Sequence, residues 1–434
     1  MKILYVLDTY YPKIDGPATV INNLANIYTQ YNLAEINILA PYYPKYKDNF
    51  KYKVIRCPSI FGPDKYRTGV PVLSTKLNKI LKQGNYDLIH IHSPFTVGKY
   101  ALKFAKKNNI PVINTIHTKY KSDFERKLKS KFLQNFMMKY IRKVLNNSDY
   151  VLTVSNLFAD ELKSDIYKCN KKVGVIRNAT EFKDCNLDLE VKSLKAKYKI
   201  SDEFLFLSVG RVVKNKNIQF SLKALKNLKD LGFDTFKFFV VGEGDYLQEL
   251  VNQTKKHGLE NNVIFVGLIK DRKILSTYYK MCNLFLFPST FDTCGIVALE
   301  AGSFGLPSFM LKDSCASELI VDNQNGFVEI DNPKSWAQRL LNITKDKSTL
   351  KSISTQAKQT LTKSWEDIAY EYYNLYKGVL FFKKLKTIKS PQIANIENKN
   401  MTKLHKCKFV TGGGIPYLEE DNFTNYATDE KAVA

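Results

Sequence analysis

The chain has 434 residues, of which 44% are hydrophobic and 25% are charged, so it has material for two globular domains and too much apolar sequence for a disordered protein. An odd cysteine count without a Cys-x-x-Cys pair argues against a disulfide framework, and no stretch approaches the roughly 20 apolar residues of a membrane-spanning helix. The net charge of +24 favours polyanionic partners, namely nucleic acid, anionic lipid or acidic polymers, although a generally basic proteome would explain it equally well.

Short apolar runs alternate with helix-length segments in the first part of the chain. The run KILYVL ends at Asp8, too early for a signal peptide, and predicts a buried parallel strand, followed by a loop at 8–17 and a helix from about Ala18. Further strands are expected at residues 36–40, 53–58, 87–94, 111–118, 150–155 and 173–179. This alternation predicts an α/β domain with a mostly parallel sheet over residues 1–182.

The segment 122–146 combines an apolar stripe with many cations. Apolar residues recur there every four positions, and a helix that lies in a membrane interface on its aromatic side would bring the cations to anionic lipid. The residues assigned to this surface are Arg126, Lys127, Phe132, Phe136, Lys139, Tyr140, Arg142 and Lys143. The alternative is an ordinary helix covering the sheet, which also needs an apolar stripe.

The second part of the chain repeats the alternation after a Lys-rich interval, 183–203, that is predicted to be a linker. Strand patterns lie at residues 204–210, 236–244, 263–267, 284–289, 306–311 and 326–330. They predict a second Rossmann-like domain over 204–363, and two such sheets facing one another form a cleft at the carboxyl ends of their strands. Apolar residues on one side of 364–384 predict a further helix. The tail, 385–434, lacks such a pattern, and its glycine run is interpreted as a flexible connector.

The most informative stretch runs from Leu284 to Leu311. Its apolar run, polar loop FDTCG and helically spaced apolar residues predict strand, loop and helix. A helix that starts near Gly295 directs unpaired N–H groups and its positive dipole end at the loop, where a phosphate would bind. The carboxylates of Asp292 and Glu300 bracket this helix start and suit hydroxyl groups. An ordinary loop or N-cap role for Asp292 is the alternative.

Cations and histidines stand at the ends of other predicted strands. Arg211 offers a planar fork and Lys216 a point charge, which together could neutralise a diphosphate, although two surface cations at a helix entrance are the simpler interpretation. His90 and His92 lie on one face of a strand, and His117 ends the next strand. A metal site needs at least three protein ligands, and the sequence supplies no third one at a fixed spacing, so we expect none.

These motifs resemble those of retaining glycosyltransferases of family 4 over about residues 1–380. The resemblance implies the GT-B fold, in which two Rossmann-like domains face each other across a cleft and a C-terminal helix crosses back onto the first domain. It assigns Glu300 to the nucleotide ribose and Asp292, where the family usually has Glu, to hydroxyls of the transferred sugar. The donor-binding residues that it implies are Gly16, Arg211, Lys216, Asp292, Gly295, Ile296 and Glu300.

The segments HSPF and HTKYKSDF resemble the acceptor-side motifs of the same family. The acceptor-side residues implied are His92, His117 and Tyr120, and the catalytic set is His117, Asp292, Arg211 and Lys216. The resemblance also implies a front-face substitution without a protein nucleophile or a metal cofactor, in which the leaving phosphate helps to deprotonate the acceptor.

The sequence therefore predicts a retaining hexosyltransferase that moves a sugar from a nucleotide-sugar such as UDP-glucose to a membrane lipid such as diacylglycerol. We expect it in the cytoplasm, peripheral on the inner face of the cell membrane. The alternatives are a glycosyltransferase of surface polysaccharide or glycoprotein synthesis, acting on a lipid-linked or protein acceptor, and a catalytically inactive GT-B binding module. No aromatic and basic motif supports a nucleic-acid partner.

Overall fold

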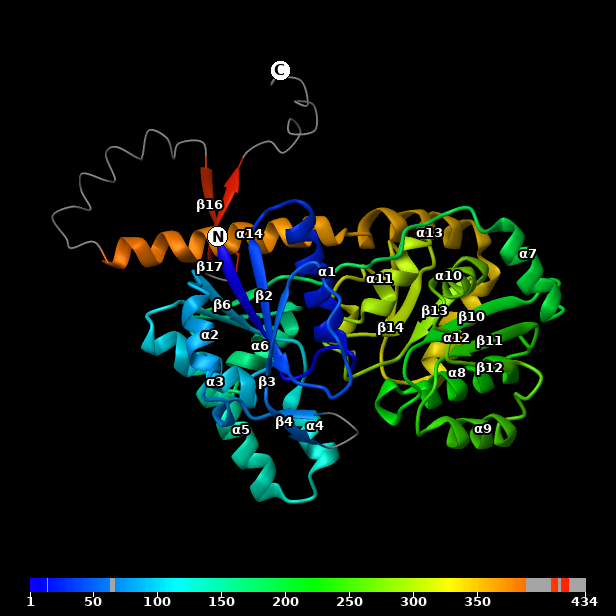
Figure 1. Ribbon diagram of the computed structural model, residues 1–434. Coiled ribbons are helices and arrows are strands. Elements are labelled where there is room, and N and C mark those ends of the chain that lie inside the picture. Colours follow the sequence, from blue (N-terminus) through cyan, green and yellow to red (C-terminus); the bar gives the residue numbers. More distant parts are fainter. Residues whose placement is uncertain (14, 63–66, 388–406, 413–414, 421–434) are drawn as a thin grey trace.

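The computed structural model describes residues 1–13, 15–62, 67–387, 407–412 and 415–420, which form two lobes lying side by side (Figure 1). A parallel sheet forms the centre of the N-terminal lobe. Its strands are β1 (Lys2–Val6), β2 (Glu35–Pro41), β3 (Lys53–Cys57), β6 (Leu88–Ile91), β7 (Val112–Ile116), β8 (Tyr150–Thr153) and β9 (Val173–Val175). The spatial order β3-β2-β1-β6-β7-β8-β9 changes direction between β1 and β6, the position at which open α/β sheets bind ligands.

Helices cover both faces of this sheet, which explains why its strands are continuous apolar runs. The helices are α1 (Gly16–Gln30), α2 (Leu77–Gln83), α3 (Thr96–Lys107), α4 (Tyr120–Lys127), α5 (Lys131–Asn146) and α6 (Asn156–Lys163). Helix α1 begins two residues before the predicted start at Ala18, because the Asp15 side chain caps it by accepting from the Ala18 N–H.

The C-terminal lobe repeats the architecture. Its parallel strands are β10 (Phe204–Val209), β11 (Phe236–Val241), β12 (Val263–Gly267), β13 (Leu284–Phe287), β14 (Ser308–Leu311) and β15 (Gly326–Glu329), in the spatial order β12-β11-β10-β13-β14-β15. Its helices are α7 (Asp188–Lys197), α8 (Ile218–Asp230), α9 (Leu247–Lys256), α10 (Arg272–Met281), α11 (Ile296–Ser303), α12 (Pro333–Lys345) and α13 (Lys347–Leu361). Helix α7 lies in the predicted linker and packs through Leu187 and Val191 on the core of this lobe.

The last long helix, α14 (Trp365–Thr387), leaves the C-terminal lobe and runs along the N-terminal lobe (Figure 1). Its side chains Ile368, Tyr372 and Tyr376 are fully buried in one cluster with β1 and α1. The Tyr28 hydroxyl of α1 donates to the Ala369 carbonyl at 2.9 Å. The predicted GT-B fold, including the helix that crosses back, is therefore confirmed.

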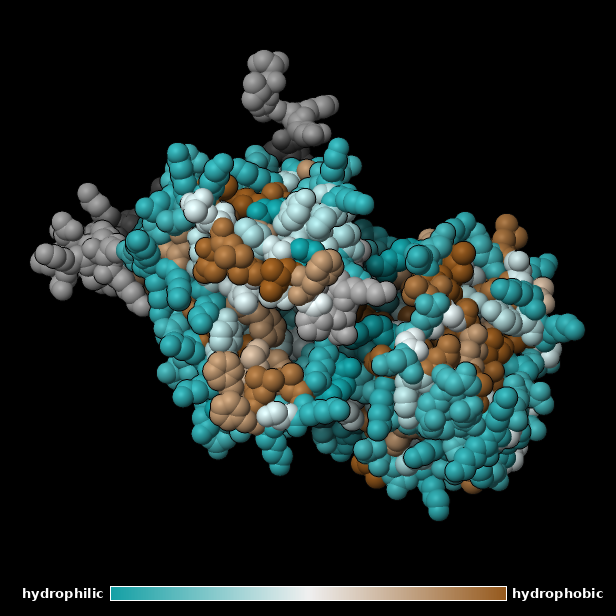
Figure 2. All heavy atoms as spheres, turned by 60° about the horizontal axis from the view of Figure 1, so that its bottom comes forward, coloured by the Kyte–Doolittle hydropathy of each residue, from teal (hydrophilic) through white to brown (hydrophobic). Residues whose placement is uncertain are grey.

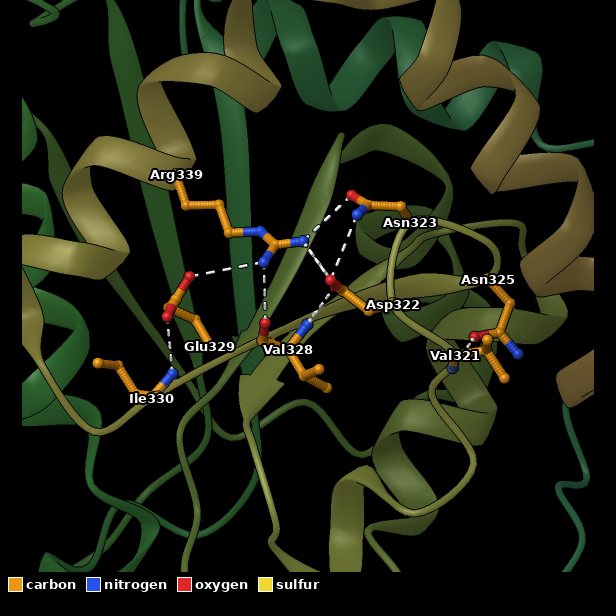
Figure 3. A network of polar contacts seen from close by, with 8 residues as sticks. All are labelled: Val321, Asp322, Asn323, Asn325, Val328, Glu329, Ile330 and Arg339. Atoms are coloured by element: carbon orange, nitrogen blue, oxygen red, sulfur yellow. Dashed lines mark hydrogen bonds and ion pairs between the residues drawn. The ribbon is translucent and has the colours of Figure 1, made fainter.

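A guanidinium holds the outer edge of the C-terminal lobe together (Figure 3). Arg339 of α12 donates to both carboxylate oxygens of Asp322 at 2.6 and 2.7 Å and to the Val328 carbonyl at 3.2 Å. Asp322 also accepts from the Val328 N–H at 3.0 Å. This bidentate contact joins β15 and the turn before it to α12 and keeps the sheet edge attached.

The structure corrects the sequence-based elements in three places. Segment 122–146 is two helices, α4 and α5, because the chain turns extended at Leu128 and Ser130 caps a new helix by accepting from the Leu133 N–H. An unpredicted antiparallel hairpin, β4 (Ser59–Phe61) and β5 (Arg67–Gly69), is followed by a short 3-10 helix, η2 (Pro71–Leu73).

In the tail, which was expected to have no regular structure, β16 (Cys407–Gly412) pairs antiparallel with β17 (Ile415–Glu420), and β17 lies against α14. The prediction of a flexible connector at the glycine run falls on 413–414, which lie outside the described residues, as do 388–406 and 421–434.

Candidate active site

The residues predicted to bind the donor lie where the carboxyl ends of the two sheets meet. Arg211 follows β10, Asp292 follows β13, and His117 follows β7. Thr293, next to Asp292, donates from its hydroxyl to the His117 carbonyl at 2.7 Å, across the boundary between the lobes. The two strand-end loops are therefore in direct contact where the lobes meet, the place at which the GT-B resemblance puts the crevice.

Lys216 and Asp292 form the closest charge pair of this crevice. The Lys216 Nζ lies 2.6 and 2.8 Å from the two carboxylate oxygens of Asp292, and both side chains are largely sheltered from solvent, with 17% and 20% exposed. Ser289 also donates to Asp292, and Asn217 donates to the Pro288 carbonyl at 3.1 Å. The 3-10 turn that carries Lys216, η3 (Lys214–Lys216), is thereby fastened to the loop after β13.

Gly295 shapes the start of α11. It is the N-cap residue and adopts a left-handed conformation with φ of +63°. A Cβ atom there would lie 3.1 Å from the Ala316 Cβ and 3.3 Å from the Phe287 ring, the same ring that the Lys216 ammonium faces at 5.3 Å. Helix α11 therefore begins beside Lys216, and the binding of a phosphate by the N–H groups of its first turn stays a prediction.

Glu300 lies one turn further along α11, at the rim between α10 and the linker. Its carboxylate accepts from the Tyr279 hydroxyl at 2.7 Å and lies 3.7 Å from Arg272, which is also 3.6 Å from Glu181. Burial raises the pKa of Glu300, while the Tyr279 hydroxyl and the Arg272 guanidinium oppose the shift. The sequence analysis missed Tyr279 and Arg272, since neither belongs to a motif.

Arg211 is exposed, and its guanidinium lies close enough to Asp15 to act on that carboxylate. Burial raises the pKa of Asp15, and the Ala18 N–H and Arg211 work against that rise. Gly16 follows this cap as the first residue of α1, and a Cβ atom there would meet nothing within 4 Å. The N-terminus of α1, which the sequence analysis treated as a loop, thus faces the cations of the opposite lobe.

The predicted acceptor-side residues are packed close together. His92 Nδ1 lies 3.0 Å from His117 Nε2, and His92 is fully buried. Tyr120 is the first residue of α4 and packs edge-on against Phe95 at 5.2 Å between ring centroids. Burial lowers the pKa of His117 to about 4, so its imidazole is neutral near pH 7. A neutral imidazole can donate from one nitrogen and accept at the other.

The predicted membrane face is only partly exposed. Phe132 and Phe136 are 81% and 57% exposed, and Leu133 beside them is 41% exposed. Tyr140 turns inward and donates to the Phe95 carbonyl at 3.0 Å, and Arg142 donates to the Ile166 carbonyl at 2.7 Å. The solvent-facing part of α5 therefore has an apolar tip made of Phe132, Leu133 and Phe136, followed by Lys139 and Lys143.

A second group of exposed apolar side chains, which the sequence analysis missed, lies on the hairpin β4–β5 and on η2. Phe61 is 88% exposed, Val72 76% and Leu73 67%. Figure 2 shows hydrophobic side chains gathered on this side of the N-terminal lobe, next to the groove between the lobes. The strands involved have three residues each, too short to give an alternation that a sequence could reveal.

The described residues have neither a metal-binding cluster nor a membrane-spanning helix. They contain no group of three or more His, Cys, Asp or Glu side chains that could hold a metal ion. No helix in the same part of the chain is both long enough and apolar enough to cross a bilayer.

Comparison with known proteins finds relatives of both lobes. Residues 14–182 match the family described as Glycosyltransferase Family 4, and residues 190–360 match Glycosyl transferases group 1. The chain is 31% identical over 343 residues to the alpha-monoglucosyldiacylglycerol synthase of Streptococcus pneumoniae (strain ATCC BAA-255 / R6), a match that covers 75% of this chain and 74% of that protein.

Solved structures share the fold at lower identity. Sucrose-phosphate synthase from Thermosynechococcus elongatus superposes with a TM-score of 0.69 at 19% identity, over 87% of this chain and 98% of that one. The Anabaena protein HepE, in complex with UDP and glucose, superposes with a TM-score of 0.65 at 18% identity, over 86% and 98% of the two chains.

Proposed function

The chain belongs to glycosyltransferase family 4 and has the GT-B fold, and on that premise we propose that it transfers a sugar from a UDP-sugar to a diacylglycerol-type lipid at a membrane surface, with retention of configuration. The relative from Streptococcus pneumoniae is named for a glucosyldiacylglycerol, and the HepE structure contains UDP and glucose. These names support the choice of lipid and nucleotide, and the geometry of the crevice supports the chemistry.

The observation that supports binding of the nucleotide-sugar is the contact of Lys216 with Asp292, whose charged atoms lie 2.6 Å apart beside the start of α11. An arriving diphosphate meets the Lys216 ammonium, the Arg211 guanidinium and the start of a helix, which together offset its charge without a metal ion. Asp292, already held in place by Lys216 and Ser289, offers its remaining lone pairs to the sugar hydroxyls.

We propose that the sugar is transferred with retention by a substitution on one face of C1. The bond between the sugar C1 and the β-phosphate oxygen breaks, and the acceptor oxygen bonds to C1 from the same face. The acceptor proton passes to the leaving phosphate, whose growing charge Arg211 and Lys216 stabilise.

The surface of the N-terminal lobe supports the part of the proposal that concerns the lipid acceptor. Phe132, Leu133 and Phe136 are exposed at the tip of α5, and Lys139 and Lys143 follow on the same helix. Aromatic and aliphatic side chains insert into the interface, while each cation near anionic lipid adds about 1 kcal/mol. We propose that this side contacts the inner face of the cell membrane, which brings the crevice to a lipid hydroxyl.

Turnover of labelled UDP-glucose and related UDP-sugars with diacylglycerol vesicles tests the proposal. We expect a glycolipid product with the anomeric configuration of the donor. Lys216→Met should lower turnover by roughly 100-fold or more, as expected for loss of a charge-stabilising donor, while Lys214→Met, which removes an exposed cation two residues away on the same turn, should leave it unchanged.

Three other outcomes would overturn parts of the proposal. Turnover only with lipid-linked oligosaccharides or protein acceptors would favour an enzyme of surface polysaccharide or glycoprotein synthesis. An inverted product would refute retention. Failure of the wild-type protein to turn over any sugar nucleotide with any of these acceptors would indicate a binding module.

A further inference from the structure

Two buried imidazoles, His90 and His92, and the half-buried His117 connect the end of β6 with the crevice. His90 uses both ring nitrogens, since Nδ1 lies 2.7 Å from the Tyr376 hydroxyl and Nε2 lies 2.7 Å from the Thr115 hydroxyl. His92 has a different environment. Its Nδ1 lies 3.0 Å from His117 Nε2, and its Nε2 is buried without a hydrogen-bond partner among the described residues.

The unpartnered nitrogen of His92 decides which ring donates in the pair. Burial lowers the pKa values of both rings, so each is neutral at pH 7 and carries one N–H. If His92 carried its proton on Nε2, a buried N–H would have no acceptor, and an orphaned donor is the less tolerated case. If His92 carries the proton on Nδ1, it donates to His117 Nε2, and its Nε2 is only an unused acceptor.

The packing around His92 keeps its ring in this orientation. The His90 and His92 ring centroids are 3.9 Å apart, and Tyr5 packs edge-on against His92 at 5.3 Å. His90 in turn is fixed by Tyr376 of the crossing helix α14. A flip of His92 would replace the Nδ1 that faces His117 with a carbon atom, so the 3.0 Å contact between the two rings selects this orientation.

The proton position on His92 fixes that on His117. A His117 ring that accepts at Nε2 must carry its own proton on Nδ1. That nitrogen has no hydrogen-bond partner among the described residues and is not enclosed, so it is open to a ligand in the crevice.

We infer that His92 is a positioning residue that holds His117 as the Nδ1–H tautomer, so that His117 presents an N–H donor to a hydroxyl of the bound sugar. That the ligand of His117 is a sugar rests on the proposed function, whereas the tautomer of His117 is inferred from the contacts of the two rings alone. His92 itself touches no substrate and acts only through His117.

Nitrogen NMR tests the tautomer without any assay of activity. The chain contains five histidines, so a sample labelled with 15N-histidine gives few ring signals, and His92→Asn and His117→Asn variants assign the two that matter. Two-bond couplings between ring protons and nitrogens distinguish Nδ1–H from Nε2–H. We expect Nδ1–H for both His92 and His117, and an Nε2–H tautomer at His117 would overturn the inference.

A pair of substitutions tests the consequence for turnover. His92→Asn retains an N–H donor near the position of Nδ1, whereas His92→Leu fills similar space without one. We expect His92→Leu to lower kcat roughly 10- to 100-fold, as is typical for loss of a group that orients a catalytic ligand, with little change in KM for the sugar nucleotide. His92→Asn should recover most of the loss.

Other results would contradict the inference. A folded His92→Leu protein with wild-type kcat, or a His92→Asn protein as impaired as His92→Leu, would show that the N–H of His92 is not used. If the wild-type protein transfers no sugar, the NMR result still decides the tautomer, and only the proposed function fails.

Discussion

Gly295 holds the loop before α11 in a conformation that other residues adopt only at a cost. Its φ of +63° is left-handed, and a Cβ would press on Ala316 and on the Phe287 ring. We expect Gly295→Ala to reduce the free energy of unfolding by about 1–3 kcal/mol and to abolish detectable binding of the sugar nucleotide, since the first turn of α11 must move. Thermal unfolding and titration with UDP-glucose measure the two effects.

Gly258 provides the matched control for this substitution. It has nearly the same φ, +61°, but a Cβ there meets nothing within 4 Å, and it follows α9, away from the crevice. Gly258→Ala should show the backbone strain alone and bind the sugar nucleotide normally. Equal loss of binding in both variants would mean that the N–H groups of α11 do not hold the donor.

Asp8 gives the N-terminal lobe a dependence on pH. It lies two residues after β1, and its carboxylate accepts from the N–H groups of Phe95 and Val97 at the start of α3. Burial raises its pKa from 3.8 to about 6. Between these values the folded state binds more protons than the unfolded state, so the free energy of unfolding falls as pH rises from about 4 to 6 and then levels off, by at most about 3 kcal/mol.

Urea denaturation of Asp8→Asn checks this expectation, because the amide does not titrate, so the decline between pH 4 and 6 should shrink to the part contributed by Asp15 and Glu300, whose pKa values burial also raises. Asp346 offers the opposite case. Hydrogen bonds from Thr349 and Ser348 lower its pKa to about 2. Its contribution to the free energy of unfolding is therefore lost only as pH falls below 4. Asp346→Asn should therefore keep the decline between pH 4 and 6, and a decline that persists undiminished in Asp8→Asn would assign it to other groups.

Single residues show where sequence reasoning stops. The cations, the acids and Gly295 were predictable because they flank apolar runs whose strand ends must meet. The contact of Lys216 with Asp292 was not predictable. The resemblance assigns Lys216 to the diphosphate of the donor and Asp292 to its sugar, and it gives no reason for the two side chains to touch. Thr293, Ser289 and Asp15 were missed as well, because a polar loop residue has no periodic signal and its partner lies far away in sequence.

At the level of elements, the strands of both sheets were predictable because burial on both faces gives unbroken apolar runs. The segment 122–146 was predicted wrongly as one helix for a geometric reason. A step of four residues advances about 40° beyond a full turn, so a stripe of six residues, five such steps, cannot stay on one face of a straight helix. The break before Lys131 lets Phe124 point into the core while Phe132 and Phe136 face solvent.

The exposed tip of α5 leads to a prediction about membrane binding. Burying a phenylalanine side chain is worth about 1.5–3 kcal/mol, so Phe132→Ser together with Phe136→Ser should weaken binding to anionic vesicles roughly 100-fold. Cosedimentation with vesicles of increasing anionic lipid content measures it. Leu189→Ser is the control, because Leu189 on α7 is also 81% exposed but belongs to the other lobe. Equal loss in both proteins, or no loss in either, would rule out α5 as a membrane contact.

At the scale of the whole molecule, α14, the hydrogen bond from Thr293 to the His117 carbonyl and the carboxylate of Glu318 all join the two lobes. Glu318 of the C-terminal lobe accepts from the Asn156 amide at 2.7 Å, the Leu157 N–H at 3.0 Å and the Arg177 guanidinium at 2.7 Å, all in the N-terminal lobe. The alternation of strands and helices predicts that there are two sheets, but it contains no information about such a contact, because the partners are more than a hundred residues apart.

Glu318→Ala should therefore loosen the lobes without unfolding either one. The donors on α6 and Arg177 can turn to water, so the cost to the closed arrangement is about 1–2 kcal/mol, less than the sum of three charge-assisted bonds. This shifts the ratio of closed to open molecules by about 5- to 30-fold, and the radius of gyration from X-ray scattering should increase and then fall again when UDP-glucose is added. Asp322→Ala breaks a comparable pair with Arg339 inside the C-terminal lobe, so it should lower the unfolding temperature and leave the radius unchanged. If the two variants scatter alike, Glu318 contributes to the stability of its own lobe and does not hold the crevice closed.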